Sequence, residues 1–147
     1  MKENNNSDSV ASIERHLRKI DRIIRLKGRE ILKDFNITIP QFTALQILIK
    51  NGELTIGQLS DKMALACSTI TDLVDRMEKN QLVVRKKDPK DRRVVRIEVL
   101  PKGHEIVKQV LEKRIRFLEQ KMADFTEEEK ISLSKGLESL YDSIKDD

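Results

Sequence analysis

The chain has 147 residues, of which 38% are hydrophobic, 37% charged and only 3% aromatic. This length supports one domain with a buried core, and an aliphatic, charge-rich composition is typical of mainly helical proteins. A single cysteine excludes an intramolecular disulfide, and no apolar run is long enough to cross a membrane. We therefore expect one soluble, cytoplasmic domain, in which the polar, non-periodic residues 1–8 form a disordered tail.

Apolar residues at three- and four-residue spacing predict a long amphipathic helix over residues 9–34. A one-faced stripe of this length exceeds what packing inside a domain of this size requires, so we expect it to be buried against another chain. The stripe is interrupted only at Lys27 and consists of Val10, Ile13, Leu17, Ile20, Ile24 and Ile31.

A second helix is predicted to begin near Pro40. Proline disfavours helical geometry at the residue before it and fits the first turn of a helix. Asn51 and Gly52 then supply the stop. The apolar residues between these signals share one face: Phe42, Leu45, Leu48 and Ile49.

A pair of helices joined by a short turn is predicted next. Thr55 and Gln58 have the T-x-x-Q spacing of a capping box, which starts a helix over residues 56–63. Beyond the segment ALAC, apolar residues from Ile70 to Met77 recur at helical spacing and mark another helix. Two helices joined by about four residues fit a helix-turn-helix unit, whose second helix enters the DNA major groove.

Two segments rich in β-branched residues, 82–87 and 94–100, bracket the charged sequence DPKDRR and predict a two-stranded hairpin. From Arg85 to Arg96 there are seven basic and two acidic residues, a net charge of +5, whereas the whole chain carries +4. Positive charge is therefore concentrated at one projecting turn, as expected of a surface that contacts a polyanion.

Two helices complete the chain. Pro101 can begin a fifth helix, whose apolar pattern continues to Phe125, and the sequence TEEE at residues 126–129 caps a sixth. The predicted fold class is mainly α (α+β): a winged helix-turn-helix lobe over residues 38–100 with a two-stranded β-wing, flanked by helical extensions at both ends.

With this order of elements, the chain resembles the MarR family of transcriptional regulators over nearly its whole length, as one domain of residues 1–147. The wing signature of that family is D-x-R followed by five residues and a Leu-Thr-like pair. The matching residues are Asp91, Arg93 and Val99-Leu100, with Arg85 in the place of the arginine that opens the wing. The recognition-helix pattern is similar in Ser68-Thr69-Ile70-Thr71 and in Val74-Asp75-Arg76-Met77-Glu78.

The sequence departs from the family in two places. Asn80-Gln81 stands where a glycine usually follows the recognition helix, so the left-handed residue is expected at Asn80 unless the helix ends differently. Leu100 stands where the family has a capping threonine.

The resemblance implies a function as well as a fold. It implies a symmetric homodimer formed by the terminal helices, residues 9–34 and 101–145. That dimer would bind a pseudo-palindromic operator in double-stranded DNA as a repressor, released by a small molecule or an oxidant.

The candidate contacts on the recognition helix lie opposite its apolar face. Hydroxyl groups near the start of the helix can reach phosphates or base edges, and Arg76 can contact phosphate or guanine. Asp72 can accept from a cytosine amino group, or stay solvated, while Asp75 orients a neighbouring arginine or stays solvated. The predicted contact set is Ser68, Thr69, Thr71, Asp72, Arg76 and Lys79.

In the wing, we expect Arg93 to enter a narrow A·T minor groove, where a planar guanidinium suits the negative potential. Asp91, two residues earlier, is expected to pair with it and set its direction. The alternative is a charged turn that only improves solubility. Predicted phosphate contacts are Arg85, Lys86, Lys87, Lys90 and Arg92.

Three further groups are candidates for sensing. Cys67, at the start of the recognition helix, could respond to oxidants, although a small residue tolerated at a helix start explains it as well. His16, Phe35 and Phe42 could line an effector pocket, although ordinary core packing explains them as well. His16 and His104 are far apart, and no cluster has metal-ligand spacing, so we expect no metal or other cofactor.

Two other classes of function compete with a DNA-binding regulator. An enzyme is disfavoured, because the chain has no glycine-rich phosphate loop, nucleophile elbow or metal triad. A helical adaptor would use its end helices to bind a protein and its wing to bind an acidic protein or DNA of any sequence. A preference for particular duplex sequences distinguishes the regulator from the adaptor.

Overall fold

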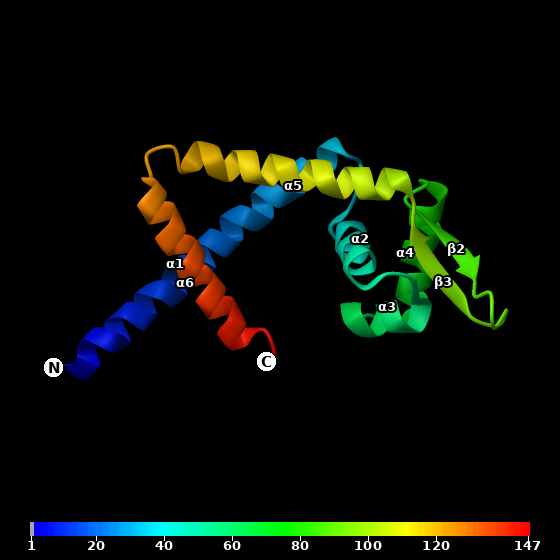
Figure 1. The fold of residues 1–147 in the computed structure, drawn as a ribbon, viewed down its shortest axis with the longest axis horizontal. Helices are drawn as coiled ribbons and strands as arrows, with labels where there is room; N and C mark the ends of the chain where they lie inside the picture. The colour runs from blue at the N-terminus through cyan, green and yellow to red at the C-terminus, as the bar shows by residue number, and fades with distance from the viewer. Residues whose placement is uncertain (1) are drawn as a thin grey trace. The chain divides into compact units, whose positions relative to one another are not determined.

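The computed structural model describes the backbone of residues 2–147 and the side chains of residues 8–147. The chain separates into two compact units, residues 1–113 and Arg114–Asp147. The elements of the first unit, drawn in blue to yellow in Figure 1, are α1 (Lys2–Asp34), α2 (Ile39–Asn51), β1 (Leu54–Thr55), α3 (Ile56–Met63), α4 (Cys67–Lys79), β2 (Val83–Lys87), β3 (Val95–Val99) and the first part of α5 (Pro101–Lys121). The second unit contains the rest of α5 and α6 (Glu127–Ile144).

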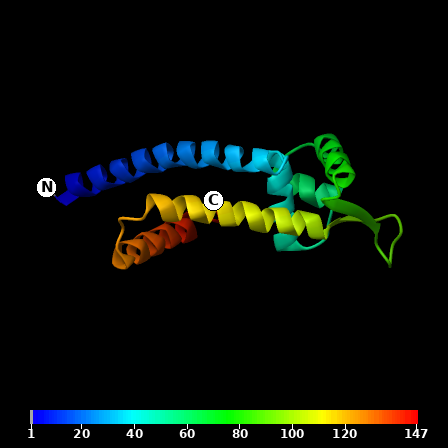
Figure 2. The same cartoon turned by 90° about the horizontal axis from the view of Figure 1, so that it is seen from above.

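The first helix, α1, begins before the predicted residue 9. The side chains of residues 1–7 lie outside the described part of the structure, so the predicted disordered tail, residues 1–8, stays a prediction. Figures 1 and 2 both show α1 as one continuous helix that runs away from α2, α3 and α4. Among its described residues only Ile31 and Leu32, near its end, are buried.

Local sequence signals fix the starts of the next two helices. Thr38 caps α2: its hydroxyl accepts from the N–H of Gln41 at 3.3 Å, and the Gln41 side chain accepts from the N–H of Thr38 at 3.1 Å. The predicted capping box of Thr55 and Gln58 is confirmed at the start of α3, with distances of 3.0 and 3.1 Å. Gly52 ends α2 with a φ of 78°, as the Asn51-Gly52 signal predicts.

One apolar core holds the lobe together. α2, α3, α4 and β3 contribute side chains whose exposed fraction is zero, and Val107 and Val110 of α5 also pack into this core. At roughly 1.5–3 kcal/mol for each large aliphatic side chain that is fully buried, this core is the main stabilising term of the first unit. Its members with zero exposure are Ala44, Leu45, Leu59, Ile70, Val74, Met77, Val83 and Ile97.

The predicted two-stranded hairpin is confirmed, and the structure adds a third strand to it. β2 and β3 pair antiparallel, with Val83 opposite Val99 and Lys87 opposite Val95. The short β1 pairs with the other edge of β3, so the order of the antiparallel sheet is β1-β3-β2. A strand of two residues has no alternating pattern that the sequence could reveal. Both views show the β2–β3 turn projecting away from the helices of its unit (Figures 1 and 2).

The junction between α4 and β2 differs from the expected helix end. The left-handed residue is Gln81, with a φ of 61°, whereas Asn80 has a φ of −86°. Leu82 follows directly and is buried, and its N–H donates to the carbonyl of Met77 at 2.9 Å. The need to bury Leu82 at once explains why the chain turns one residue later than the resemblance suggests.

The start of α5 is packed tightly against the sheet. Pro101 begins the helix, as predicted, and a Cβ at Gly103 would lie 2.6 Å from the carbonyl oxygen of Leu82 and 2.8 Å from Cγ1 of Val99. Only a glycine fits there without displacing backbone. Gly103 therefore lets α5 approach the base of the hairpin.

In the second unit, Thr126 caps α6 through the predicted capping box with Glu129, at 3.1 Å in both directions. None of the residues described in α6 is buried. None of the described helices of either unit is long and apolar enough to span a lipid bilayer.

Candidate nucleic-acid interface

The fourth helix presents one buried face and one exposed face. Ile70, Val74 and Met77 are completely buried, which confirms the predicted apolar face. The hydroxyl of Thr71 donates to the carbonyl of Cys67 at 2.8 Å, so its oxygen can still accept a hydrogen bond. Every predicted contact residue of the helix is exposed: Ser68, Thr69, Thr71, Asp72, Arg76 and Lys79.

Arg85, in the middle of β2, is bound to α4. Its guanidinium donates to the carboxylates of Asp75 and Glu78, and the exposed fraction of its side chain is only 29%. Burial by itself lowers the pKa of Arg85, but the hydrogen bonds to Asp75 and Glu78 outweigh it and hold the pKa above its ordinary value. The arginine therefore joins the hairpin to α4 and offsets part of the negative charge of Asp75 and Glu78.

The next basic residue is also engaged within the lobe. Nζ of Lys86 lies 3.7 Å from a carboxylate oxygen of Glu53 and 3.9 Å from one of Glu98. These distances join exposed side chains, so the pairs contribute little to stability. They place the ammonium group of Lys86 near two carboxylates of its own unit.

The turn of the hairpin is organised by Asp88. One oxygen of its carboxylate accepts from the N–H groups of Lys90 and Asp91, at 2.8 and 3.3 Å, and the other accepts from Nε of Arg96 at 3.0 Å. The N–H of Lys90 and then the guanidinium of Arg96 are the main causes that hold the pKa of Asp88 below its ordinary value. The carboxylate is therefore charged throughout the physiological range.

Arg93 is the most exposed of the paired arginines in the hairpin. The exposed fraction of its side chain is 90%, and Nε lies 3.2 Å from Oδ1 of Asp91, which is the contact that the sequence predicts. The backbone N–H of Arg93 also donates to Oδ1 of Asp91, at 3.1 Å. Asp91 thus directs an arginine whose surface is almost fully available.

Three cations of the turn, Lys87, Lys90 and Arg92, are exposed and form no side-chain ion pair within the part of the chain that the structure describes. A guanidinium or ammonium without a carboxylate partner can bind phosphate without first giving up a contact. Together with Arg93 they form the outer cationic surface of the hairpin, which Arg85 joins to α4.

Comparison with known proteins identifies the family of this chain. Residues 37–95 match the MarR family. An uncharacterized HTH-type transcriptional regulator of Bacillus subtilis (strain 168), YsmB, is 53% identical over 138 residues, which are 94% of each chain. The chain belongs to the MarR family. It is accordingly a DNA-binding transcriptional regulator and not an enzyme.

Solved structures agree with this assignment. The structure of a MarR family protein from Bacillus stearothermophilus is 47% identical, covers 95% of this chain and 97% of its own, and has a TM-score of 0.86. A point mutant of MepR from S. aureus, solved bound to an oligodeoxyribonucleotide, shares the fold at 21% identity and a TM-score of 0.70, covering 87% and 94% of the two chains. The winged helix-turn-helix of the MarR family is thus the fold of this chain.

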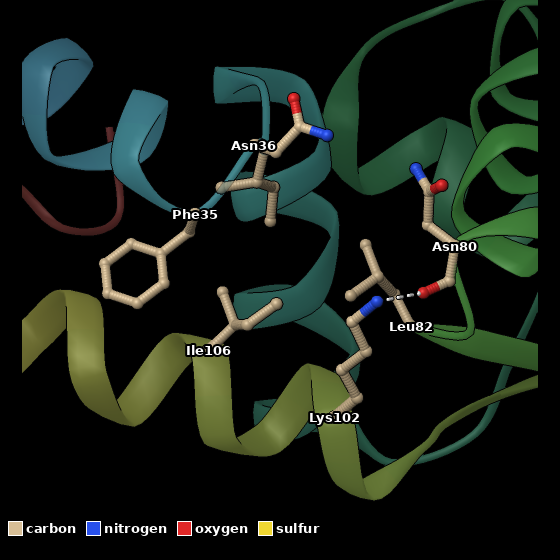
Figure 3. Close-up of a pocket in the computed structure, with 7 residues that line it drawn as sticks. Phe35, Asn36, Asn80, Leu82, Lys102 and Ile106 are labelled. Atoms are coloured by element: carbon tan, nitrogen blue, oxygen red, sulfur yellow. Dashed lines mark hydrogen bonds between the residues drawn. The ribbon is translucent and has the colours of Figure 1, made fainter.

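In the described structure, the three residues predicted for an effector pocket lie in different surroundings. Phe35 lines a cavity of about 80 Å³ together with Lys102 and Ile106 (Figure 3). Phe42 is buried in the core, and His16 is exposed on α1, where its ring lies 2.8 Å from the carbonyl of Ser12. The cavity is far smaller than the roughly 300–1,000 Å³ of typical ligand pockets.

The cavity in Figure 3 contains one interaction between elements. Nζ of Lys102, in the first turn of α5, donates to the carbonyl of Asn80 at the end of α4, at 2.9 Å. A cation at the carboxyl end of a helix interacts favourably with the helix dipole. Lys102 therefore compensates for the missing glycine cap after α4.

The remaining predicted sensor, Cys67, is the exposed first residue of α4. In the residues that the structure describes, no group of three or more His, Cys, Asp or Glu side chains is placed to hold a metal ion.

The sequence reasoning missed three groups that shape this interface. Glu78 shares Arg85 with Asp75, and the i, i+3 spacing of the two acids on α4 was the available signal. Asp88 precedes Pro89, and Asp-Pro is a turn signal in which the aspartate binds backbone two residues ahead. Arg96 has no local signal, because its partner lies beyond the turn, at the end of the opposite strand.

Proposed function

We propose that this MarR-family regulator is a homodimeric repressor that binds a pseudo-palindromic operator. In this proposal α4 enters the major groove, and the wing, residues 82–100, enters the adjoining minor groove. The observation that carries it is an exposed polar face of α4, joined through Arg85 to a hairpin whose projecting turn has Arg93 and three cations that form no ion pair among the described residues. This is the combination that positions a protein on phosphates and lets it read bases.

The structure supports different roles for the basic residues of the wing. Lys87, Lys90 and Arg92 are exposed and can bind phosphates, and Arg93 can enter the minor groove. Arg85 and Lys86 were predicted as phosphate contacts, but both are engaged with carboxylates. We therefore assign Arg85 to holding the wing against α4, and Lys86 to at most a secondary phosphate contact.

The recognition helix supplies the sequence reading in this proposal. Ser68, Thr69 and Thr71 lie in its first turn and a half, where hydroxyl groups can bind phosphate or base edges. Arg76 and Lys79, further along, are cations on the same exposed side of the helix. The exposed carboxylate of Asp72 is available to a cytosine amino group, whereas that of Asp75 is engaged with Arg85.

Dimer formation is supported by apolar side chains that the single chain leaves exposed. α1 exposes a stripe that includes Ile13, Leu17 and Ile20, with 52%, 40% and 54% of each residue accessible. α6 exposes Leu133, Leu137 and other apolar residues of its own stripe. Contiguous apolar faces of this kind on a folded chain mark interaction surfaces, and a second copy of the chain is the proposed partner.

Release of the operator by a small molecule or an oxidant is the part of the proposal that concerns signal sensing. The cavity beside Phe35 and the exposed Cys67 are the two places where such a signal can be tested. A thiol reagent and a panel of small aromatic compounds, applied to the DNA complex, would separate the two.

The first experiment is selection from a random duplex library, with bound DNA sequenced after washes at two salt concentrations. We expect an inverted repeat that survives the higher salt, with half-site centres about 10 to 10.5 base pairs apart. Recovery of unbiased DNA that is lost at the higher salt would contradict a sequence-specific regulator and favour the adaptor. A single asymmetric site bound by a monomer would contradict the dimer alone.

The second experiment tests the wing. Arg93→Ala should weaken operator binding by about 1–3 kcal/mol, because one groove contact is lost, while the dimer stays folded. Lys108→Ala, which removes an exposed cation of α5 outside the wing and α4, is the matched control and should leave binding nearly unchanged. Unchanged affinity of Arg93→Ala in a fluorescence anisotropy titration would refute the role of Arg93.

A further inference from the structure

The turn of the wing contains an ion pair that the proposed DNA contacts leave without a role. Asp88 follows the end of β2 and Arg96 lies on β3, and Oδ2 of the carboxylate is 3.0 Å from Nε of the guanidinium. The exposed fractions of the two side chains are 18% and 34%, against 90% for Arg93. Arg96 therefore lies along the hairpin, engaged within it, and is not the cation that reaches outward.

The other oxygen of Asp88 fixes the turn itself. Oδ1 accepts from the N–H groups of Lys90 and Asp91, at 2.8 and 3.3 Å. The backbone N–H of Asp88 donates to the carbonyl of Val94 across the turn, at 2.9 Å. One carboxylate thus binds the backbone of the turn and, through Arg96, the opposite strand.

These contacts continue to Arg93. The N–H of Val94 donates to the carbonyl of Asp91 at 3.0 Å, and Oδ1 of Asp91 accepts from both the N–H and Nε of Arg93. The direction of the Arg93 side chain depends on Asp91, and the backbone of Asp91 is held by Asp88. A chain of described hydrogen bonds therefore leads from Arg96 to the exposed guanidinium of Arg93.

We propose that Asp88 and Arg96 are a positioning pair, which holds the wing turn in the shape that presents Arg93 to the minor groove. This inference rests on the proposed DNA-binding role of the wing. Neither residue contacts DNA in this view. Arg96, although it belongs to the basic cluster, acts through Asp88, and Asp88 strengthens DNA binding although it is an anion.

The sign of one substitution separates this inference from simple electrostatics. Removing a carboxylate from a surface that binds a polyanion ordinarily strengthens binding, because a repulsive charge is lost. If Asp88 positions Arg93, Asp88→Ala weakens binding instead. Glu98→Gln, which removes another carboxylate from the same hairpin, is the matched control and should leave binding unchanged or strengthen it.

The experiment uses the whole 147-residue chain and two probes, namely the duplex most enriched by the unsubstituted protein from a random library and poly(dA)·poly(dT). Asp88→Ala should weaken binding to both by roughly tenfold, the loss expected for one misplaced groove contact. Asp88→Asn keeps an oxygen that accepts from the two backbone N–H groups, so it should recover part of the affinity. Arg96→Met should weaken binding, and Asp88→Ala combined with Arg96→Met should be no weaker than Asp88→Ala alone.

The decisive variant combines Asp88→Ala with Arg93→Ala. If Asp88 acts through Arg93, the double variant binds no more weakly than Arg93→Ala alone. Unchanged or stronger binding by Asp88→Ala overturns the inference, and so does a full tenfold loss that persists without Arg93. If the unsubstituted protein enriches no sequence and Arg93→Ala binds as well as it does, the proposed function fails instead. Sedimentation and thermal unfolding of each variant establish that the dimer and fold are intact.

Discussion

The lobe of residues 38–100 and the terminal helices are stabilised in different ways. In the lobe, apolar residues of α2, α3, α4 and the sheet are buried within the same chain, many of them completely. In α6 none of the described residues is buried, and in α1 the described buried residues, Ile31 and Leu32, lie near its end. The same aliphatic composition therefore serves a core in one region and exposed faces in the other.

Because of this difference, the stability of a single chain and the formation of the proposed dimer should depend on different residues. Substitutions in the lobe should change the free energy of unfolding of a single chain. Substitutions on the exposed stripes of α1 and α6 should change it little and act on the proposed dimer instead.

The largest effect is expected for a charge on the stripe of α1. Leu17→Glu should abolish association at micromolar concentration, because each protomer loses about 1.5–3 kcal/mol of apolar burial and two charges would be buried in the dimer. Lys19→Glu places the same side chain on the opposite side of the helix and should leave the dimer intact. Sedimentation velocity measures both, and a dimeric Leu17→Glu would place the interface elsewhere.

The next effect is expected in the core of the lobe. Leu45→Ala should lower the free energy of unfolding by about 2–5 kcal/mol, because the completely buried leucine leaves a cavity. Leu137→Ala, half exposed on α6, should change it by less than about 0.5 kcal/mol in a monomeric background such as Leu17→Glu. Urea unfolding curves make the comparison, and equal losses for the two would contradict it.

A smaller effect tests the packing of α5 on the lobe. Gly103→Ala should destabilise the lobe by about 1–3 kcal/mol, because the added Cβ meets the carbonyl of Leu82 and a methyl group of Val99. A Cβ at Gly136 in α6 meets no atom within 4 Å, so Gly136→Ala should be neutral or stabilising by about 0.5–1 kcal/mol. Destabilisation of similar size by both substitutions would show that space around the glycine does not decide the outcome.

The smallest effect is a pH dependence confined to the wing. The pKa of Asp88 is lowered in the folded protein, so its stabilising contribution is complete above the unfolded value of about 4 and is lost as the pH falls through the lower, folded value. The amide resonance of Lys90, whose N–H donates to Asp88, should therefore titrate below pH 4. Asp88→Asn should remove that transition, and a midpoint at or above the ordinary value would contradict the hydrogen bonds that Asp88 accepts.

The sequence predicted the features whose causes are local. The capping boxes at Thr55 and Thr126 are confirmed because both partners lie within three residues. The buried face of α4 is confirmed because helical spacing by itself determines which side chains share a face. The pairing of Asp91 with Arg93 is likewise a contact between near neighbours.

Features that depend on distant partners were not predictable in the same way. Arg85 was interpreted as a phosphate contact, because the sequence does not show that Asp75 and Glu78 come within reach when the chain turns at Gln81. The role of Gly103 depends on how closely α5 approaches the carbonyl of Leu82. Such contacts follow from packing between elements, which local spacing does not determine.

The short junction at Gln81 has a consequence for the DNA that the protein can read. α4 ends at Lys79 and β2 begins at Val83, and Arg85 binds the hairpin back onto α4. The major-groove and minor-groove contacts of the proposed complex are therefore held at a fixed spacing in each protomer. Each protomer can bind only a half-site in which the two grooves have that spacing. One inserted base pair shifts the two contacts by about 3.4 Å along the axis, so insertions in a half-site should be tolerated far less than base changes between the contacts.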